Sequence, residues 1–120
     1  MPLVKVEMCG KYDRKIKSEL MDYIVEEICK NTSTFSKNVY VYINEHNADN
    51  VSKTAPFVTI DWTEISDRTP EKKKIIMTNL TEKLVEITGE KKEEIVILFT
   101  DIPLKNAMLG GITRYENPNW

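Results

Sequence analysis

The feature that most constrains the fold is an internal repeat of about 55 residues in a chain of 120. Each copy contains a short strand pattern, an amphipathic helix pattern with an apolar residue at every fourth position, and a second strand pattern. The matching pairs are Pro2/Pro56, Val4/Val58, Val6/Ile60, Leu20/Ile76, Ile24/Leu80, Ile28/Leu84, Val39/Ile95, Val41/Ile97 and Ile43/Phe99. Because the match extends through all three elements, each copy is expected to form one β-α-β unit.

The element boundaries follow from apolar patterning and from helix-end signals. Strands are expected at residues 3–8, 39–44, 56–62 and 95–99, and helices at residues 13–30 and 70–88. Thr69 can cap the second helix, Pro70 suits its first position, and Gly89 fits the left-handed residue just past its end. The nearly continuous apolar run at 95–99 is typical of a buried parallel strand.

The predicted fold class is α+β (α/β), in a single domain over residues 1–120. Two right-handed β-α-β units give a four-stranded sheet with both helices on one face. The other face then needs cover, which a threefold assembly with the sheets turned inward would supply. The expected division is repeat one at 2–45, a linker at 46–55, repeat two at 56–111 and a tail at 112–120.

Composition narrows the class of protein. The net charge of −2 provides no global basic field, so neither nucleic acid nor an anionic membrane is an expected partner. No apolar run approaches the roughly 20 residues of a membrane span, and no signal-peptide pattern opens the chain. Cys9 and Cys29 are expected to be reduced thiols in the cytoplasm, and His46 is the only histidine, so neither a metal site nor a cofactor is expected.

The second half carries the more distinctive sequence. It reads PFVTIDW, then DRTPEKKKIIMTNLTEKLVEITG, EEIVILFTDIP and LGG. The chain resembles the 4-oxalocrotonate tautomerase family of the tautomerase superfamily over nearly its whole length. The first half is the weaker match and rests on Pro2, Gly10-Lys11 and the strand and helix patterns. The resemblance implies a tautomerase/MIF-like fold and, because fused two-unit members of the superfamily are trimers, a homotrimer.

Pro2 is the candidate for chemistry. Methionine is normally removed before a small residue such as proline, and removal would leave Pro2 with a free secondary amine. An α-amino group has an ordinary pKa of about 7.7–8.0, and burial or a nearby cation lowers it. Such an amine is a suitable general base near neutral pH. Pro56 heads the second copy, but its nitrogen is an internal amide, so we expect it only to start a strand.

Arg68 matches the arginine with which the family, at the start of its helix, binds a substrate carboxylate. A guanidinium group suits this task because it forms two parallel hydrogen bonds to a carboxylate. Lys11 is taken as its equivalent in the first half, and nearby Arg14 could compete with Lys11 for that role.

The sequence departs from the family in two places. The family's second arginine, early on the strand after the helix, is replaced by Tyr40 in one half and Val96 in the other. This change removes a cation that polarises the substrate carbonyl, and Tyr40 could donate a hydrogen bond instead. The aromatic residue before the glycines is replaced by Ala107-Met108. Arg114 and Tyr115 follow in the tail, where a neighbouring subunit could meet them.

These residues predict an enzyme that catalyses keto–enol tautomerisation of a small 2-oxo or 2-hydroxy unsaturated acid. Pro2 would be the base and Arg68 the carboxylate clamp, with Lys11 or Tyr40 assisting at the carbonyl. Two alternatives stay open. A protonated proline with an acidic partner, for which Glu45 is the candidate, would serve hydration, dehalogenation or decarboxylation. The missing arginine could instead mean a non-catalytic trimeric interaction module.

Overall fold

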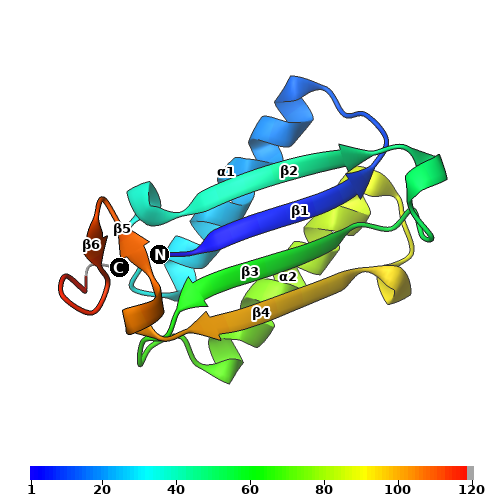
Figure 1. The fold of residues 1–120 in the computed structure, drawn as a ribbon. Helices are drawn as coiled ribbons and strands as arrows, with labels where there is room; N and C mark the ends of the chain where they lie inside the picture. The colour runs from blue at the N-terminus through cyan, green and yellow to red at the C-terminus, as the bar shows by residue number, and fades with distance from the viewer. Residues whose placement is uncertain (119–120) are drawn as a thin grey trace.

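Two β-α-β units form the body of the protein, which a computed structural model describes over residues 1–118 (Figure 1). The first unit contains β1 (Leu3–Cys9), α1 (Arg14–Asn31) and β2 (Tyr40–His46). The second contains β3 (Phe57–Thr63), α2 (Pro70–Thr88) and β4 (Val96–Ile102). The first residues of matching elements are 54 positions apart for β1 and β3 and 56 apart for the later pairs, so the predicted repeat is confirmed.

The helix ends follow the capping signals in the sequence. Asp13 caps α1 by accepting a hydrogen bond from the backbone N–H of Ile16 at 2.9 Å. Thr69 caps α2 in the same way, Pro70 occupies the first turn, and Gly89 ends the helix with a φ of 71°. In both units the helix therefore begins directly after a capping side chain.

Short 3₁₀ helices flank the second strand of each unit. They are Ser36–Asn38 and Ala48–Asn50 in the first unit, and Lys92–Glu94 and Leu104–Asn106 in the second. The segment predicted as a linker over 46–55 therefore begins with the last residue of β2 and contains a 3₁₀ turn. The second unit alone continues into a hairpin of β5 (Met108–Leu109) and β6 (Ile112–Thr113). The predicted tail over 112–120 starts with β6, and its last two residues lie outside the described residues.

The predicted four-stranded sheet is confirmed, and its strand order is β2-β1-β3-β4. Strands within a unit are parallel, whereas β1 and β3 at the centre are antiparallel with Leu3 opposite Asp61. The antiparallel centre places the start of β1 beside the end of β3. The amino terminus of the first unit therefore lies next to the loop that leads into α2 of the second.

Both helices cover the same face of the sheet (Figure 1). The core between them consists of alternate strand residues and the apolar stripes of both helices: Val4, Val6, Met8, Val58, Ile60, Trp62, Leu20, Ile24, Ile28, Ile76, Leu80 and Leu84. All of these are at most 2% exposed. Burying one large side chain of this kind contributes about 1.5–3 kcal/mol, so the predicted stripes account for most of the packing.

The opposite face of the sheet is open in a single chain. Its strands place Tyr40, Tyr42, Phe57, Val96 and Leu98 there, each more than a third exposed. The prediction that residues 95–99 form a buried strand is therefore wrong for one chain, because β4 is an edge strand with only its helix-facing side covered. The apolar side chains on the other side of β4 form part of the open sheet face that we expected to need cover.

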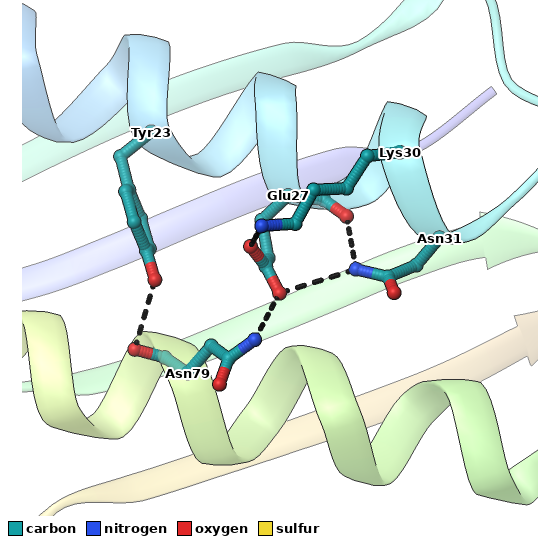
Figure 2. Close-up of polar contacts among 5 residues, drawn as sticks. All are labelled: Tyr23, Glu27, Lys30, Asn31 and Asn79. Carbon is teal, nitrogen blue, oxygen red and sulfur yellow. Dashed lines mark hydrogen bonds and ion pairs between the residues drawn. The ribbon is translucent and has the colours of Figure 1, made fainter.

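A polar cluster joins the two helices (Figure 2). Glu27 on α1 is 2% exposed, and its Oε1 accepts hydrogen bonds from Asn79 Nδ2 on α2 at 2.5 Å and from Asn31 Nδ2 at 3.1 Å. Lys30 Nζ lies 2.9 Å from the other carboxylate oxygen, and Tyr23 donates to the backbone oxygen of Asn79 at 3.3 Å.

Neither helix in the described part of the chain is long and apolar enough to cross a membrane.

Candidate active site

The amino terminus is held between the two units. The nitrogen of Met1 donates to Oγ1 of Thr63, at the end of β3, over 3.1 Å. Pro2 is buried, and its carbonyl accepts a hydrogen bond from the backbone N–H of Tyr40 at 2.9 Å. Removal of Met1 would leave the new amine one residue along the chain, where consecutive Cα atoms are about 3.8 Å apart.

Arg68 reaches the same threonine from the loop before α2. Its side chain is 5% exposed. Nη1 donates to the backbone oxygen of Thr63 at 2.6 Å and to its Oγ1 at 2.8 Å, and Nη2 donates to Thr34 Oγ1 at 3.1 Å. Thr63 Oγ1 therefore accepts from both Arg68 and the amino terminus, so the structure brings Arg68 to the start of β1.

The ring of Trp62 packs against the guanidinium group of Arg68. The guanidinium carbon lies 4.9 Å from the centroid of the Trp62 ring, a cation–π distance. Trp62 is held by a 2.8 Å hydrogen bond from Nε1 to Asp101, whose other oxygen lies 2.6 Å from Lys73 Nζ. Burial lowers the pKa of Arg68 to about 10, although Asp67 and Asp101 act in the opposite direction. The guanidinium group therefore stays charged at neutral pH.

Arg114 is the second buried cation of this region. It follows β6, its backbone N–H donates to the oxygen of Ala107 at 2.8 Å, and its side chain is 3% exposed. Nε and Nη2 of Arg114, and Nε of Arg68, are buried without a hydrogen-bond partner in the described residues. Within residues 1–118 neither arginine forms an ion pair with a carboxylate. Buried charges of this kind favour an anion.

Both arginines act on the amino-terminal nitrogen. Burial, together with the positive charges of Arg68 and Arg114, lowers the pKa of the Met1 amine from 8.0 to about 5. A neutral amine beside two cations can accept a proton from an anionic acid bound there. The site therefore combines a base with the groups that would attract its substrate.

Tyr40 contacts this site through its backbone only. It pairs with Leu3 across β1 and β2, and its side chain is 38% exposed. Leu3 alternates with the buried Val4, so the ring of Tyr40 lies on the open face of the sheet. Within one chain, the Tyr40 hydroxyl is not part of the buried cluster around Pro2.

Lys11 and Glu45 lie at the other end of the sheet. Lys11 follows the seven-residue β1 whereas Pro2 precedes it, a separation of about 25 Å at roughly 3.3 Å per residue. Glu45 accepts hydrogen bonds from Lys17 Nζ at 3.0 Å and from the backbone N–H of Tyr12 at 2.7 Å, which lower the pKa of Glu45. The structure therefore does not bring Lys11 or Glu45 to Pro2 within one chain.

The two helix caps correct the expected equivalence of Lys11 and Arg68. Asp13 and Thr69 cap corresponding helices, so the residue before each cap is Tyr12 in the first unit and Arg68 in the second. The loop between strand and cap is two residues longer in the second unit. Tyr12 packs against the core, and Arg14 is exposed at the start of α1.

The sequence did not predict Thr63 as a site residue, and it did not predict that Arg114 would be buried beside the amino terminus. Thr63 carried no signal beyond its place after the second-half strand. Arg114 was expected to meet a neighbouring subunit, but the hairpin buries it within its own chain. Its neighbour Tyr115 is 60% exposed, with Lys105 Nζ 4.7 Å from its ring centroid.

A large cavity lies away from this site. It has a volume of about 520 Å³, lies at the opposite end of β1, and is lined by Pro56, Cys9 and His46 among others. A smaller one of about 390 Å³ is lined by Ser33, Leu104 and residues 64–67, directly before Arg68. The nitrogen of Pro56 is an internal amide and cannot act as a base. We therefore place the candidate active site at the Pro2 end.

Comparison with known proteins agrees with this architecture. Residues 56–113 match the sequence model of a family described as "Tautomerase enzyme". A search of curated protein sequences gives no match. Among solved structures, a fused 4-OT wild-type symmetric trimer (Q0) superimposes with a TM-score of 0.84 at 16% identity, covering 95% of this chain and 97% of that one.

Two further structures have the same fold. Pt0534 inactivated by 2-oxo-3-pentynoate gives a TM-score of 0.80 at 20% identity, with 94% of this chain and 96% of that chain covered. FG41 malonate semialdehyde decarboxylase inhibited by 3-bromopropiolate gives 0.76 at 15% identity, with coverages of 94% and 93%. The second unit therefore matches the tautomerase family model, and the chain as a whole has the fold of the fused 4-OT structures.

Proposed function

We propose that the chain, once Met1 is removed, is an isomerase that moves a proton between oxygen and carbon of a small 2-oxo or 2-hydroxy unsaturated acid. The observation that carries this proposal is the amine site: a half-buried amino terminus beside two buried arginines that have no carboxylate partner in the described residues. Such a site attracts an anionic acid and offers it an uncharged base.

In this mechanism the Pro2 nitrogen accepts the hydroxyl proton of the enol and delivers it to carbon. Arg68, packed over Trp62, supplies a positive charge that attracts and orients the acid. While Met1 is present, the Thr63 hydroxyl accepts from both Arg68 and the amino terminus, so Thr63 lies beside the position where removal of Met1 would leave the new amine. General-base catalysis of this kind contributes about 10²- to 10⁴-fold to a rate.

The active form is proposed to be a homotrimer, as in the fused 4-OT structure. The open sheet face, with Tyr42 and Leu98 more than half exposed, supports an assembly that covers it. Lys11 and Tyr40 could assist at the carbonyl only across such an interface, because neither side chain reaches Pro2 within one chain.

The alternative reactions have less support. Hydration, dehalogenation or decarboxylation would need an acidic partner for a protonated proline, and Glu45 is bound to Lys17 at the far end of the sheet. The likeness to malonate semialdehyde decarboxylase concerns the fold. A non-catalytic module would not explain why two buried arginines at the amino terminus form no ion pair within residues 1–118.

The test is ketonisation of phenylenolpyruvate by the wild type, Pro2→Ala and Pro56→Ala, with intact mass establishing that Met1 is absent. Pro2→Ala should lose about 10²- to 10⁴-fold in kcat/KM. Pro56→Ala is the matched control, since it changes the same residue type at the start of the other unit and should keep the rate. Equal rates for wild type and Pro2→Ala would exclude the proline base.

A further inference from the structure

The side chain of Arg114 has an unused binding edge. Nε and Nη2 of a guanidinium group point their N–H bonds in the same direction and form the edge that binds a carboxylate through two hydrogen bonds. In Arg114 both atoms are buried and have no partner in the described residues. A buried charge is costly without a partner, so this edge calls for an anion that the described part of the chain does not supply.

The corresponding edge of Arg68 is partly occupied. Its Nη2 donates to Thr34 Oγ1 and its Nη1 donates twice to Thr63, which leaves Nε as the nitrogen without a partner. Arg68 can therefore offer its Nε to a single oxygen more readily than a full edge to a carboxylate. The two arginines differ in what they can bind.

The C-terminal hairpin holds Arg114 in place. The backbone N–H of Arg114 donates to Ala107 O at 2.8 Å. Thr113 Oγ1 donates to Glu116 Oε1 at 2.8 Å, and the N–H of Glu116 donates back to Thr113. The hairpin lies beside the amino terminus of the chain (Figure 1). The positive charge of Arg114 lowers the pKa of the Met1 amine. Arg114 is therefore a fixed part of the Pro2 site.

We propose that Arg114 binds the substrate carboxylate through Nε and Nη2, which leaves Nε of Arg68 to the neighbouring 2-oxygen. This division of tasks rests on the proposed function in taking the ligand to be a 2-oxo acid. It assigns the carboxylate to a tail residue of the second unit. The cation missing at Tyr40 and Val96 is thereby replaced from another part of the chain.

A carboxylate bound at Arg114 also changes the pKa of the amino-terminal amine. Arg68 and Arg114 both lower the pKa of the amine. A bound carboxylate offsets their charge, so it raises that pKa, and the amine becomes a stronger proton acceptor when substrate is present. Substrate binding and base strength are therefore coupled through Arg114.

The experiment measures binding of 2-oxobutanoate by calorimetry to the full chain, so it requires no turnover. We expect Arg114→Gln to bind about 10- to 100-fold more weakly than wild type. Arg114→Lys keeps the positive charge but cannot form two parallel hydrogen bonds to a carboxylate. Its affinity for 2-oxobutanoate should therefore lie between those of wild type and Arg114→Gln. Lys74→Gln, which removes one positive charge from an exposed position of α2, is the charge-matched control and should bind like wild type.

A second readout separates binding from a merely structural role. In Arg114→Gln the pKa of the amino-terminal amine should rise, and saturating 2-oxobutanoate should raise it less than in wild type. Equal affinity of wild type and Arg114→Gln, or no binding by wild type at millimolar concentration, would overturn the inference. If Pro2→Ala keeps its ketonisation rate while Arg114→Gln loses binding, the anion site stands and the proposed reaction fails.

Discussion

Asn79 on α2 donates a hydrogen bond to the buried carboxylate of Glu27 on α1 over 2.5 Å (Figure 2). A shift of 56 positions relates Asn79 to Tyr23 and Glu27 to Lys83, so the matching contact in the duplicated interface is Lys83 with Tyr23. There Lys83 Nζ lies 5.3 Å from the centroid of the Tyr23 ring. The two copies of one helix–helix contact have thus diverged into a hydrogen bond and a cation–π contact.

This divergence predicts an unequal effect on stability. Asn79→Ala should lower the free energy of unfolding by about 1–3 kcal/mol, because it removes a donor from a buried carboxylate. Alanine's better helix propensity offsets at most about 0.7 kcal/mol of that loss. Urea denaturation followed by circular dichroism gives the difference.

The matched change in the other copy is Lys83→Ala. It removes a cation–π contact worth about 0.5–1 kcal/mol and a surface ion pair with Glu86, and it should cost less than Asn79→Ala. Glu27→Gln keeps a side chain of the same shape at the buried position and tests whether the negative charge itself matters. Equal losses for Asn79→Ala and Lys83→Ala would mean that the buried hydrogen bond has no special weight.

The open face of the sheet predicts the site of assembly. Leu98 on β4 is 55% exposed on this face, and a covered apolar interface would not tolerate a carboxylate there. Leu98→Asp should therefore convert a trimer to monomers, which light scattering after size exclusion would detect. Ile75→Asp is the control, since Ile75 is 46% exposed on α2, away from that face. A wild-type monomer, or a trimeric Leu98→Asp variant, would contradict this assignment of the interface.

The sequence was sufficient for the fold because the repeat constrained each element twice. The apolar positions of α1 matched those of α2, and the capping residue Thr69 marked the start of the second helix. The repeat did not allow the burial of β4 to be predicted in the same way. An apolar run fits both a central strand and an edge strand whose second face is covered by another subunit, and only the strand order separates the two.

The sequence predicted only some of the site residues, for a different reason. Pro2 and Arg68 lie at ends of different units, and their proximity depends on the antiparallel pairing of β1 and β3. Arg114 reaches them through a hairpin of two-residue strands, too short to leave a periodic pattern. Lys11 was misaligned because the two-residue difference falls within the loop before the helix, where no apolar pattern fixes the register.

The amino-terminal amine gives the most direct test of the site's electrostatics. In a chain that keeps Met1, the folded pKa of this amine is about 5, whereas the ordinary value is 8.0. Between these values the unfolded chain binds a proton that the folded chain does not. Stability should therefore rise with pH across that window, and acetylation of the amine should remove this part of the dependence.

Reactivity reports the same pKa without unfolding. A neutral amine adds to the triple bond of 2-oxo-3-pentynoate: a nitrogen–carbon bond forms, and the amine proton moves to the neighbouring carbon. The product carries the full mass of the reagent. Alkylation should be half-maximal near pH 5 in the folded chain that keeps Met1 and near pH 8 in urea. With Met1 removed, the Pro2 amine should shift in the same direction, and kcat/KM should fall as pH drops through its pKa because a protonated amine cannot accept a proton. A folded midpoint near pH 8 would show that the nitrogen is solvated and that Arg68 and Arg114 do not act on it.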